Sequence, residues 1–584
     1  MSESNECDFI IVGGGTAGCV LANRLSASGD RRVVLLEAGE DYPPGREPAE
    51  IRDPFYRAAN HGAHLWPDTR VHWHPSANDA AGPAGEPLPY AQARVIGGGS
   101  SVNAMMAIRG LSGDFDGWEA AGASGWAWQD VLPYFRKLES DQDFAGADVH
   151  GPDVHGHDGP VPIRRIARGD WPPICVAADR ALARQGHAFI DDLNADPRDG
   201  YARVTLNNLP DRRVSAATAY LTPEVRARAN LRIVARTRVL RVLFDGKRAV
   251  GVAIHGPDGP GAIHGRNVIL SSGALQTPAL LLRSGVGPGA ALKELGIPVV
   301  ADNQGVGTGL QDHPSAGVGL IVRSDYRQDP ALRPNGNLVL RLSSSSLSPD
   351  HAGAPAHDIF MPVYNKTTWH ALGQRLGLVQ AVLFGPYSRG TVTLRSPDPS
   401  VAPDVRFNLL ADPRDMARMK TAYRFAAALA AAPELAGLIH GTFPASLTER
   451  VRRLNMATPR NGALAAIASW LVDLSGITRN AVMRHGLGTT TDMSELARDD
   501  TALEAWLVEN ARGFFHASCS CPMGAETDPL AALDSRCRVR GVDGLRVVDA
   551  SIMPRITRAS TNIQTMMIGE RAADLIIADN RDPR

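Results

Sequence analysis

The sequence predicts an α/β protein, α+β overall, in which the two chain ends build one Rossmann-like sheet and the middle forms an inserted second domain. Three observations carry this prediction. A strand, a glycine-rich turn and a helix open the chain, β-rich sequence returns between residues 230 and 273, and a buried strand followed by a helix closes it. The length of 584 residues also exceeds the roughly 250–300 residues at which single cores stop growing.

The opening unit is a β-rich run that ends in Gly13-Gly14-Gly15-Thr16-Ala17-Gly18, a G-x-G-x-x-G motif. A helix and a second apolar run, Val33 to Leu36, follow, and Glu37 ends that run. A dinucleotide requires this order: the first glycine permits a tight turn, the second lets the backbone approach a pyrophosphate, and the third lets the helix sit close on the strand. Glu37 can accept hydrogen bonds from a ribose. A solvated acid at a strand end is its alternative interpretation.

The next segment, residues 42–89, is rich in Pro and Gly and predicts an extended loop, in which His72 and His74 are expected at the surface. A second glycine cluster, residues 97–103, is expected to open a helix. Strands are then expected at 231–234, 239–244, 249–254 and 268–271. Thr277 suits the N-cap of the following helix, with Pro278 as its first residue.

The middle of the chain, from about 315 to 510, alternates expected strands with Ala-rich helices such as 415–432. Near the end, Leu545–Val548 is an expected buried strand, Asp549 stands at its carboxyl end, and residues 563–579 predict a helix. Ligands of doubly wound sheets bind outside the carboxyl ends of the strands. Both chain ends are therefore expected to meet at one cofactor site.

Composition narrows the class of protein. The net charge of −1 gives no sign of a basic surface for nucleic acid or acidic membranes. No secretory signal and no run of 18 apolar residues are visible, so we expect a cytoplasmic protein without a membrane span. Six cysteines in so long a chain predict neither a disulfide framework nor a zinc site, and we expect no metal.

Four motifs in order resemble the glucose–methanol–choline (GMC) flavin oxidoreductases over essentially the whole chain. They are Gly13–Gly18 with Glu37-Ala38-Gly39; Gly97-Gly98-Gly99-Ser100-Ser101-Val102-Asn103; Gly273-Ala274-Leu275-Gln276-Thr277-Pro278 continuing to Ser284-Gly285-Val286-Gly287; and His516 with Gly544–Ser551, Met553-Pro554 and Thr561–Thr565. Phe515-His516-Ala517-Ser518 and Asn562 look most like the 5-hydroxymethylfurfural-oxidase and aromatic-alcohol branch of that family.

The resemblance implies FAD as the cofactor and a set of residues that would bind it. We expect FAD to be held non-covalently, because Val102 stands where some members of the family carry a flavin-linked histidine. The implied cofactor residues are Gly13, Gly15, Thr16, Ala17, Gly18, Glu37, Ala38, Arg94, Gly98, Gly99, Ser100, Asn103, Ala104, Met105, Val239, Asp549, Ala550, Asn562 and Thr565.

The resemblance also implies the domain plan. An FAD-binding domain would comprise residues 5–160, 225–315 and 530–584, with 42–92 as an extended loop or lid. A substrate-binding domain, built on an antiparallel sheet flanked by helices, would comprise 161–224 and 316–529.

Oxidising an alcohol removes a proton from oxygen and a hydride from carbon, and the flavin N5 can take the hydride. A histidine suits the proton step, because its ordinary pKa of about 6.5 lies near working pH. His516 is the predicted base and Asn562 the predicted partner of the substrate oxygen, although Asn562 could instead cap its helix. Phe515, His516 and Asn562 are the predicted substrate pocket. His313 is expected only to satisfy local backbone groups.

Several functions stay open at this point. The first is oxidation of primary, aromatic or furanic, alcohols to aldehydes with O2 as acceptor. The second is the same chemistry with a quinone or another acceptor. A non-redox lyase and a light-driven decarboxylase are further possibilities on the same fold, since fold does not fix function. The retained His516 and Asn562 pair favours redox chemistry.

Overall fold

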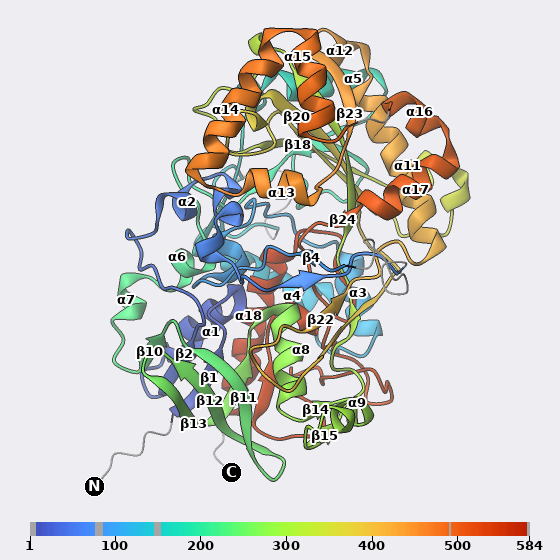
Figure 1. Cartoon of the computed structure of the whole chain (residues 1–584). Helices are drawn as coiled ribbons and strands as arrows, with labels where there is room; N and C mark the ends of the chain where they lie inside the picture. Colours follow the sequence, from blue (N-terminus) through green and yellow to red (C-terminus); the bar gives the residue numbers. More distant parts are fainter. Residues whose placement is uncertain (1–6, 76–85, 145–153, 490–491, 581–584) are drawn as a thin grey trace.

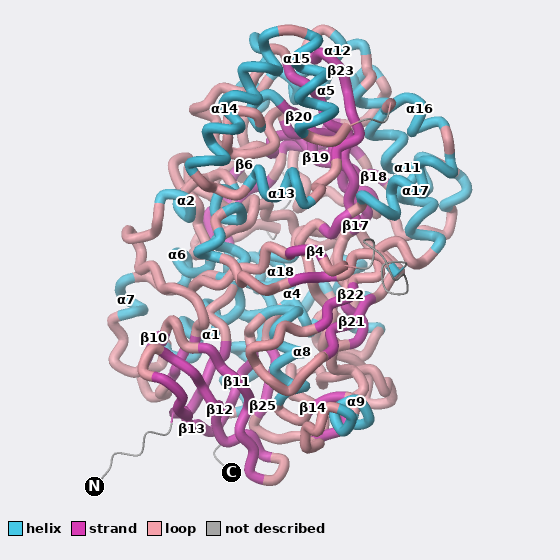
Figure 2. Tube along the Cα trace, viewed as in Figure 1, coloured by secondary structure: helices cyan, strands magenta, loops and turns pink. Residues whose placement is uncertain are grey.

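The computed structural model describes residues 7–75, 86–144, 154–489 and 492–580. Two sheets organise the molecule, one near the chain termini and one at the opposite end (Figure 1). Figure 2 shows helices packed around both sheets and long loops between them. Within the described ranges, no helix combines the length and the apolar character needed to cross a bilayer.

The first sheet confirms the predicted Rossmann-like arrangement. Its strand order is β10-β2-β1-β13-β12-β11, and β25 pairs with β13. The neighbours β10, β2, β1, β13 and β25 run parallel, whereas β11, β12 and β13 form antiparallel hairpins. The elements around it are β1 (Cys7–Val12), α1 (Thr16–Ser26), β2 (Val33–Leu36), α3 (Ser112–Ala120), α4 (Trp128–Leu138), β5 (Glu139–Asp141), β6 (Val161–Arg165), β9 (Thr205–Leu206), α6 (Ala216–Tyr220), α7 (Pro223–Arg226), β10 (Leu231–Val234), β11 (Arg238–Asp245), β12 (Arg248–Gly256), β13 (Gly259–Leu270), α8 (Gly273–Arg283), β14 (Val286–Gly287), α9 (Gly289–Glu294), β15 (Ala301–Asp302), β25 (Leu545–Val547) and α18 (Thr561–Asp579).

The second sheet has eight strands in the order β23-β17-β20-β19-β18-β8-β7, with β24 beside β17. All its pairs are antiparallel except β7 with β8. Its central strands β17, β18 and β19 are buried along their whole length, so both faces of the sheet are covered there. The elements here are α5 (Pro173–Arg184), β7 (Phe189–Ile190), β8 (Gly200–Arg203), β17 (Pro314–Val322), β18 (Gly336–Leu342), α10 (Ser344–Leu347), β19 (Ile359–Tyr364), β20 (Leu376–Leu383), α11 (Pro413–Ala430), α12 (Pro433–Ala436), β23 (Ile439–Ala445), α13 (Glu449–Asn455), α14 (Pro459–Leu474), α15 (Gly476–Ala481), α16 (Met493–Arg498), α17 (Asp500–Asn510) and β24 (Arg512–Gly513).

The segment 42–92 lies between the two sheets, and its residues 76–85 fall outside the described part. The segment contains α2 (Ala49–Arg52), β3 (Arg70–Val71) and β4 (Leu88–Pro89). Elsewhere in the chain, a small separate sheet is formed by β16 (Thr308–Leu310), β21 (Gly390–Thr393) and β22 (Asp404–Arg406). The expectation that His72 and His74 lie at the surface was wrong, because both are buried. The ring nitrogens of His74 lie 3.2 Å from the Leu409 carbonyl and 2.9 Å from the Ala511 carbonyl.

Two expected helix starts were also wrong. The second glycine cluster forms only a 3₁₀ turn, Gly98–Ser101. The helix assigned to Thr277 and Pro278 begins at Gly273, so Pro278 lies inside α8. Proline removes the bond that its N–H would give to the carbonyl four residues earlier. Here the Ser520 hydroxyl donates to that carbonyl, of Ala274, at 2.6 Å and replaces the lost partner.

The hydrophobic cores divide the chain slightly differently from the expected domains. Residues 214–221 and 519–523, both assigned to the substrate domain, pack in the core of the first sheet. The other segments of the second sheet share a separate core. The domain boundaries therefore remain a proposal.

Candidate active site

One cavity of about 1100 Å³ runs between the two sheets. Its walls come from the two glycine loops, the segment 42–92, the start of α18 and the loop that carries His516. Segments from both ends of the chain thus meet at one site, as the carboxyl ends of β1, β2 and β25 require.

The glycine loops form a backbone cradle at the first sheet. Gly13 has φ +103°, and a Cβ there would lie 2.5 Å from the Ser271 carbonyl oxygen. Gly98 has φ +53°, and its Cβ would lie 2.7 Å from Gly15 Cα. The Gly97 N–H donates to the Gly14 carbonyl at 2.7 Å, which ties the loops together. Helix α1 begins after Gly15 without a side-chain cap, so its first N–H groups are available to an anion.

Glu37 stands at the end of β2 with a fixed carboxylate. Oε2 accepts a hydrogen bond from Gly14 N–H at 2.9 Å, and Oε1 accepts one from Gly39 N–H at 2.7 Å. Burial raises the pKa of this carboxyl, while these backbone donors act against that rise. Each oxygen keeps a second lone pair, so Glu37 can still accept hydrogen bonds from a ligand in the cavity.

Most of the expected cofactor residues line this cavity. They are Gly13, Gly15, Thr16, Ala17, Glu37, Ala38, Gly98, Gly99, Asn103, Ala104, Met105, Val239, Asp549, Ala550, Asn562 and Thr565. Gly18, Arg94 and Ser100 are absent from the wall. A Cβ on Gly18 would lie 2.0 Å from the Gly13 carbonyl oxygen, Arg94 lies over the Trp66 ring, and the Ser100 hydroxyl bonds the Gly97 carbonyl at 2.6 Å. These three residues contact the residues that form the wall and do not line the cavity themselves.

Asp549 lines the cavity but turns its carboxylate into the protein. Oδ2 accepts hydrogen bonds from Gly273 N–H at 2.9 Å and from the Thr277 hydroxyl at 2.6 Å. Oδ1 accepts from Ser551 N–H at 2.8 Å. The residue therefore joins the start of α8 to the end of β25.

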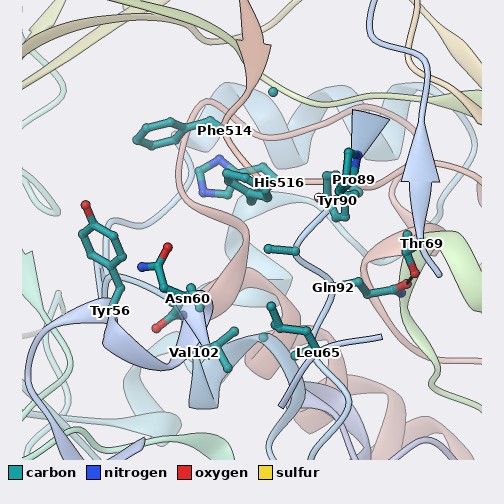
Figure 3. Close-up of a pocket in the computed structure, with 18 of the residues that line it drawn as sticks. Tyr56, Asn60, Leu65, Thr69, Pro89, Tyr90, Gln92, Val102, Phe514 and His516 are labelled. Carbon is teal, nitrogen blue, oxygen red and sulfur yellow. Dashed lines mark hydrogen bonds between the residues drawn. The ribbon is translucent and has the colours of Figure 1, made fainter. Parts of the chain in front are cut away.

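His516 faces a second imidazole. Its Nδ1 lies 2.8 Å from Nδ1 of His313. The expectation that His313 only satisfies backbone groups was therefore incomplete. Asp312 places this pair, because its Oδ1 accepts hydrogen bonds from the backbone N–H of both histidines, at 2.7 and 2.8 Å. Figure 3 shows the His516 ring close to Phe514, on the side of the cavity opposite Asn60 and Val102.

Burial controls the protonation of this pair. It lowers the pKa of His516 to about 3. Burial also lowers the pKa of His313 well below its ordinary value, and the nearby His516 adds to this effect. Both rings are therefore neutral near pH 7, and each has one bare nitrogen.

Asn562 does not cap its helix. The N-cap of α18 is Ser560, and Asn562 is the second helical residue. Its side-chain Oδ1 and Nδ2 have no hydrogen-bond partner in the part of the chain that the structure describes. An unpaired buried amide is costly, so its place on the cavity wall suits a polar ligand.

Aromatic rings surround the imidazole. The ring centroids of Phe514 and His516 lie 5.1 Å apart, and those of Tyr90 and Phe515 lie 5.2 Å apart. Phe515 adopts φ +61°, a strained conformation for a bulky residue. This wall favours a flat, apolar ligand.

Sequence reasoning missed the residues that position the site. His313 and Asp312 lie about two hundred residues from His516, and no local pattern connects them. Arg213 was also missed: it is buried, donates to the Asn103 carbonyl at 2.6 Å and to the Ile51 carbonyl at 3.1 Å, and so joins the second glycine loop to segment 42–92. Its pKa falls to about 9 through burial.

The fold and this cavity define a dinucleotide-binding oxidoreductase. Residues 7–315 match the N-terminal family model of GMC oxidoreductases, and residues 386–569 match the C-terminal one. The chain therefore belongs to the GMC oxidoreductase family. It is an FAD-dependent alcohol oxidoreductase.

Known proteins resemble this chain along nearly its full length. It is 39% identical to 5-(hydroxymethyl)furfural oxidase of Methylovorus sp. (strain MP688), over 98% of each chain. It is 31% identical to oxygen-dependent choline dehydrogenase of Brucella suis biovar 1 (strain 1330), covering 98% of this chain and 96% of that one. The crystal structure of pyridoxine 4-oxidase from Mesorbium loti superposes with a TM-score of 0.80 at 27% identity, covering 98% of this chain and 99% of that one.

Proposed function

We propose that this protein oxidises primary aromatic or furanic alcohols to aldehydes, with His516 as the base and O2 as the electron acceptor. The observation that carries the proposal is the pair of Nδ1 atoms of His516 and His313, 2.8 Å apart at the cavity wall. The 39% identity to a 5-(hydroxymethyl)furfural oxidase and the 27% identity to a pyridoxine 4-oxidase support an aromatic substrate and O2.

The two imidazoles select the protonation of the base. One of two facing Nδ1 atoms must carry the hydrogen. The Thr557 backbone favours a hydrogen on the His313 ring, and we place this hydrogen on Nε2, which has no other partner among the described residues. With that proton on Nε2, His313 offers a bare Nδ1, which accepts from His516 Nδ1–H. His516 then presents a bare Nε2 for the hydroxyl proton of the substrate.

Asn562 and the aromatic wall orient the substrate. The unpaired Asn562 amide can donate to the alcohol oxygen, while Phe514 and Tyr90 lie against a flat ring. Such positioning lowers the barrier because it fixes the reacting geometry before the reaction. The apolar wall also excludes water, which keeps His516 neutral until the alcohol gives up its proton.

The residues that line the cavity suit FAD. The glycine cradle leaves no room for a Cβ, the free first turn of α1 suits a pyrophosphate, and Glu37 suits a ribose. FAD, when bound, supplies the hydride acceptor. Val102, which lines the cavity, has only a hydrocarbon side chain, so we propose that FAD is held without a covalent bond.

Two measurements test the proposal. Under anaerobic conditions an aromatic primary alcohol should bleach the visible absorbance of the flavin; an unchanged spectrum with every alcohol tried would favour a non-redox role. In air, one H2O2 should form per aldehyde. Bleaching without H2O2 in air would replace O2 by a quinone or another acceptor, as in a dehydrogenase.

A further inference from the structure

The segment that holds α13, α14 and α15 carries an unusual concentration of exposed apolar side chains. Of the ten large apolar side chains that are exposed in the described chain, six lie between residues 447 and 477. They are Leu447 at 40%, Leu464 at 47%, Ile467 at 60%, Trp470 at 60%, Leu474 at 55% and Ile477 at 85%. Single exposed apolar residues are ordinary, but a contiguous group marks an interaction surface.

Helix α14 is built with its large residues outward. Its buried positions are the small Ala465, Ser469 and Val472. Leu464, Ile467 and Leu474 recur at spacings of three and seven residues, so they share one outer face, with Trp470 at its edge. A helix that is apolar all round is normally covered on every side. Figure 1 places α14 and α15 at the outer surface, at the end of the molecule opposite the chain termini.

The same segment is strongly basic. Residues 446–489 contain six arginines and two acidic residues, whereas the whole chain has a net charge of −1. Arg450, Arg460 and Arg484 are exposed. Arg460 lies four residues before Leu464 and so shares the apolar face. The two acidic residues are already paired, Glu449 with Arg452 at 2.6 Å and Asp473 with Arg375 at 2.9 Å. The near-zero overall charge hid this local excess.

We propose that this face, comprising Leu464, Ile467, Trp470, Leu474 and Ile477 with Arg450, Arg460 and Arg484, docks on an anionic phospholipid bilayer. Apolar side chains that project between lipid headgroups, an interfacial tryptophan and surrounding arginines are the features that hold a helix in a membrane surface. The 85% exposure of Ile477 shows a projecting feature rather than a flat one.

A second copy of this chain fits the face less well. A two-fold contact would place the same surface on itself and bring the arginines of both copies together. Their charges would repel, since the two acidic residues of this segment are already paired. An anionic bilayer instead supplies the missing negative charge.

Docking here would bring the bilayer close to a helix that lines the cavity, because α13 contacts α14. Helix α13 lies next to α14 along the chain, and its residues Val451, Arg452 and Leu454 line the cavity. The docking itself is independent of the proposed reaction and is tested without turnover.

The test is sedimentation of the FAD-loaded protein with vesicles, with flavin absorbance in the pellet as the measure. We expect binding to vesicles of phosphatidylcholine with phosphatidylglycerol, weaker binding as salt rises, and little binding to phosphatidylcholine alone. The double variant Ile467→Ser/Ile477→Ser should bind more than roughly tenfold less, since both side chains are exposed in solution and lose only their place among lipids. Arg460→Gln should bind about fivefold less.

Leu530→Ser is the matched control, because Leu530 is 51% exposed outside this face. It should bind like the unaltered protein. Equal binding by the double variant, or no binding by the unaltered protein, would overturn the proposal. So would a dimer in light scattering that the double variant converts to monomer, because a second copy would then be the occupant.

Discussion

Two buried histidine sites in this molecule have opposite electrostatics. His155 lies among carboxylates: its Nε2 is 2.6 Å from Asp192 and its Nδ1 is 3.1 Å from Glu139. Burial lowers its pKa, but the hydrogen bonds to these two acids raise it to about 9. His516 has a neutral imidazole as its partner, and burial lowers its pKa to about 3.

The difference shows that burial alone keeps a histidine neutral, whereas buried carboxylates beside it keep a histidine charged. In the His155 cluster, Arg165 bonds Asp192 at 2.9 Å and Asp141 at 3.0 Å, so positive and negative groups balance. Arg109 also bonds Glu139 there. This site is built to keep charge and hold segments together. The His516 site is built to lack charge, which leaves a nitrogen free for chemistry.

The contrast between the two histidine sites depends most on His516 being required for the reaction. We expect His516→Ala to keep FAD but to slow anaerobic flavin reduction by roughly 10²–10⁴, the usual scale for a general base. Stopped-flow absorbance measures this rate. His255→Ala, at an exposed position, is the control and should leave it unchanged. An unaltered rate in His516→Ala would remove this residue from the proposed reaction.

At the charged site the expected loss is stability rather than rate. His155→Leu should lower the free energy of unfolding by about 3–5 kcal/mol, because the acids around it lose a buried positive partner. Denaturant unfolding measures the change. The folded fraction should still reduce its flavin at the normal rate. A variant as stable as the unaltered protein would mean that the two arginines alone balance the cluster.

At the proposed catalytic site, His313 allows the protonation of His516 to be tested separately from the packing around it. His313→Leu should lower kcat by roughly 10²-fold with little change in KM, since the His516 ring loses the acceptor that fixes its orientation. His313→Asn should recover most of the loss, because its amide oxygen can accept from His516 Nδ1–H. If the Leu and Asn variants were equally slow, His313 would serve packing and not protonation.

How far the sequence predicts these sites depends on where their parts lie along the chain. The cradle could be predicted, because Gly13, Gly15, Gly18 and Glu37 fall within one strand–helix–strand unit. His516 was found through its motif, but its partner was not. Asp312 and His313 meet His516 only because β17 and β24 pair, a contact across about two hundred residues.

The His155 cluster was not predicted for the same reason. Its members come from five places in the chain: the segment before α3, strand β5, the loop between β5 and β6, strand β6 and the loop after β7. Each looks like an ordinary surface charge in sequence. The predicted start of α8 was wrong for a different reason. The dipeptide Thr277-Pro278 has the local form of a helix start, but the hydroxyl of Ser520, far along the chain, donates to the Ala274 carbonyl and allows the helix to begin earlier. Tertiary contacts decided each case against the local pattern.

The smallest expected effect is in the alkaline pH dependence of stability. The folded pKa of His155, about 9, lies above its unfolded value of about 6.5. Its contribution is therefore complete below about pH 6.5 and is lost as pH rises through 9, because the folded state then releases the proton that it had held more tightly. Unfolding midpoints from pH 6 to 10 should fall for the unaltered protein and fall less for His155→Leu. Above about pH 7 His516 adds nothing to this dependence, since it is neutral in both the folded and the unfolded state there. Parallel curves for the two proteins would show that His155 is not charged in the folded state, and the contrast between the two histidine sites would disappear.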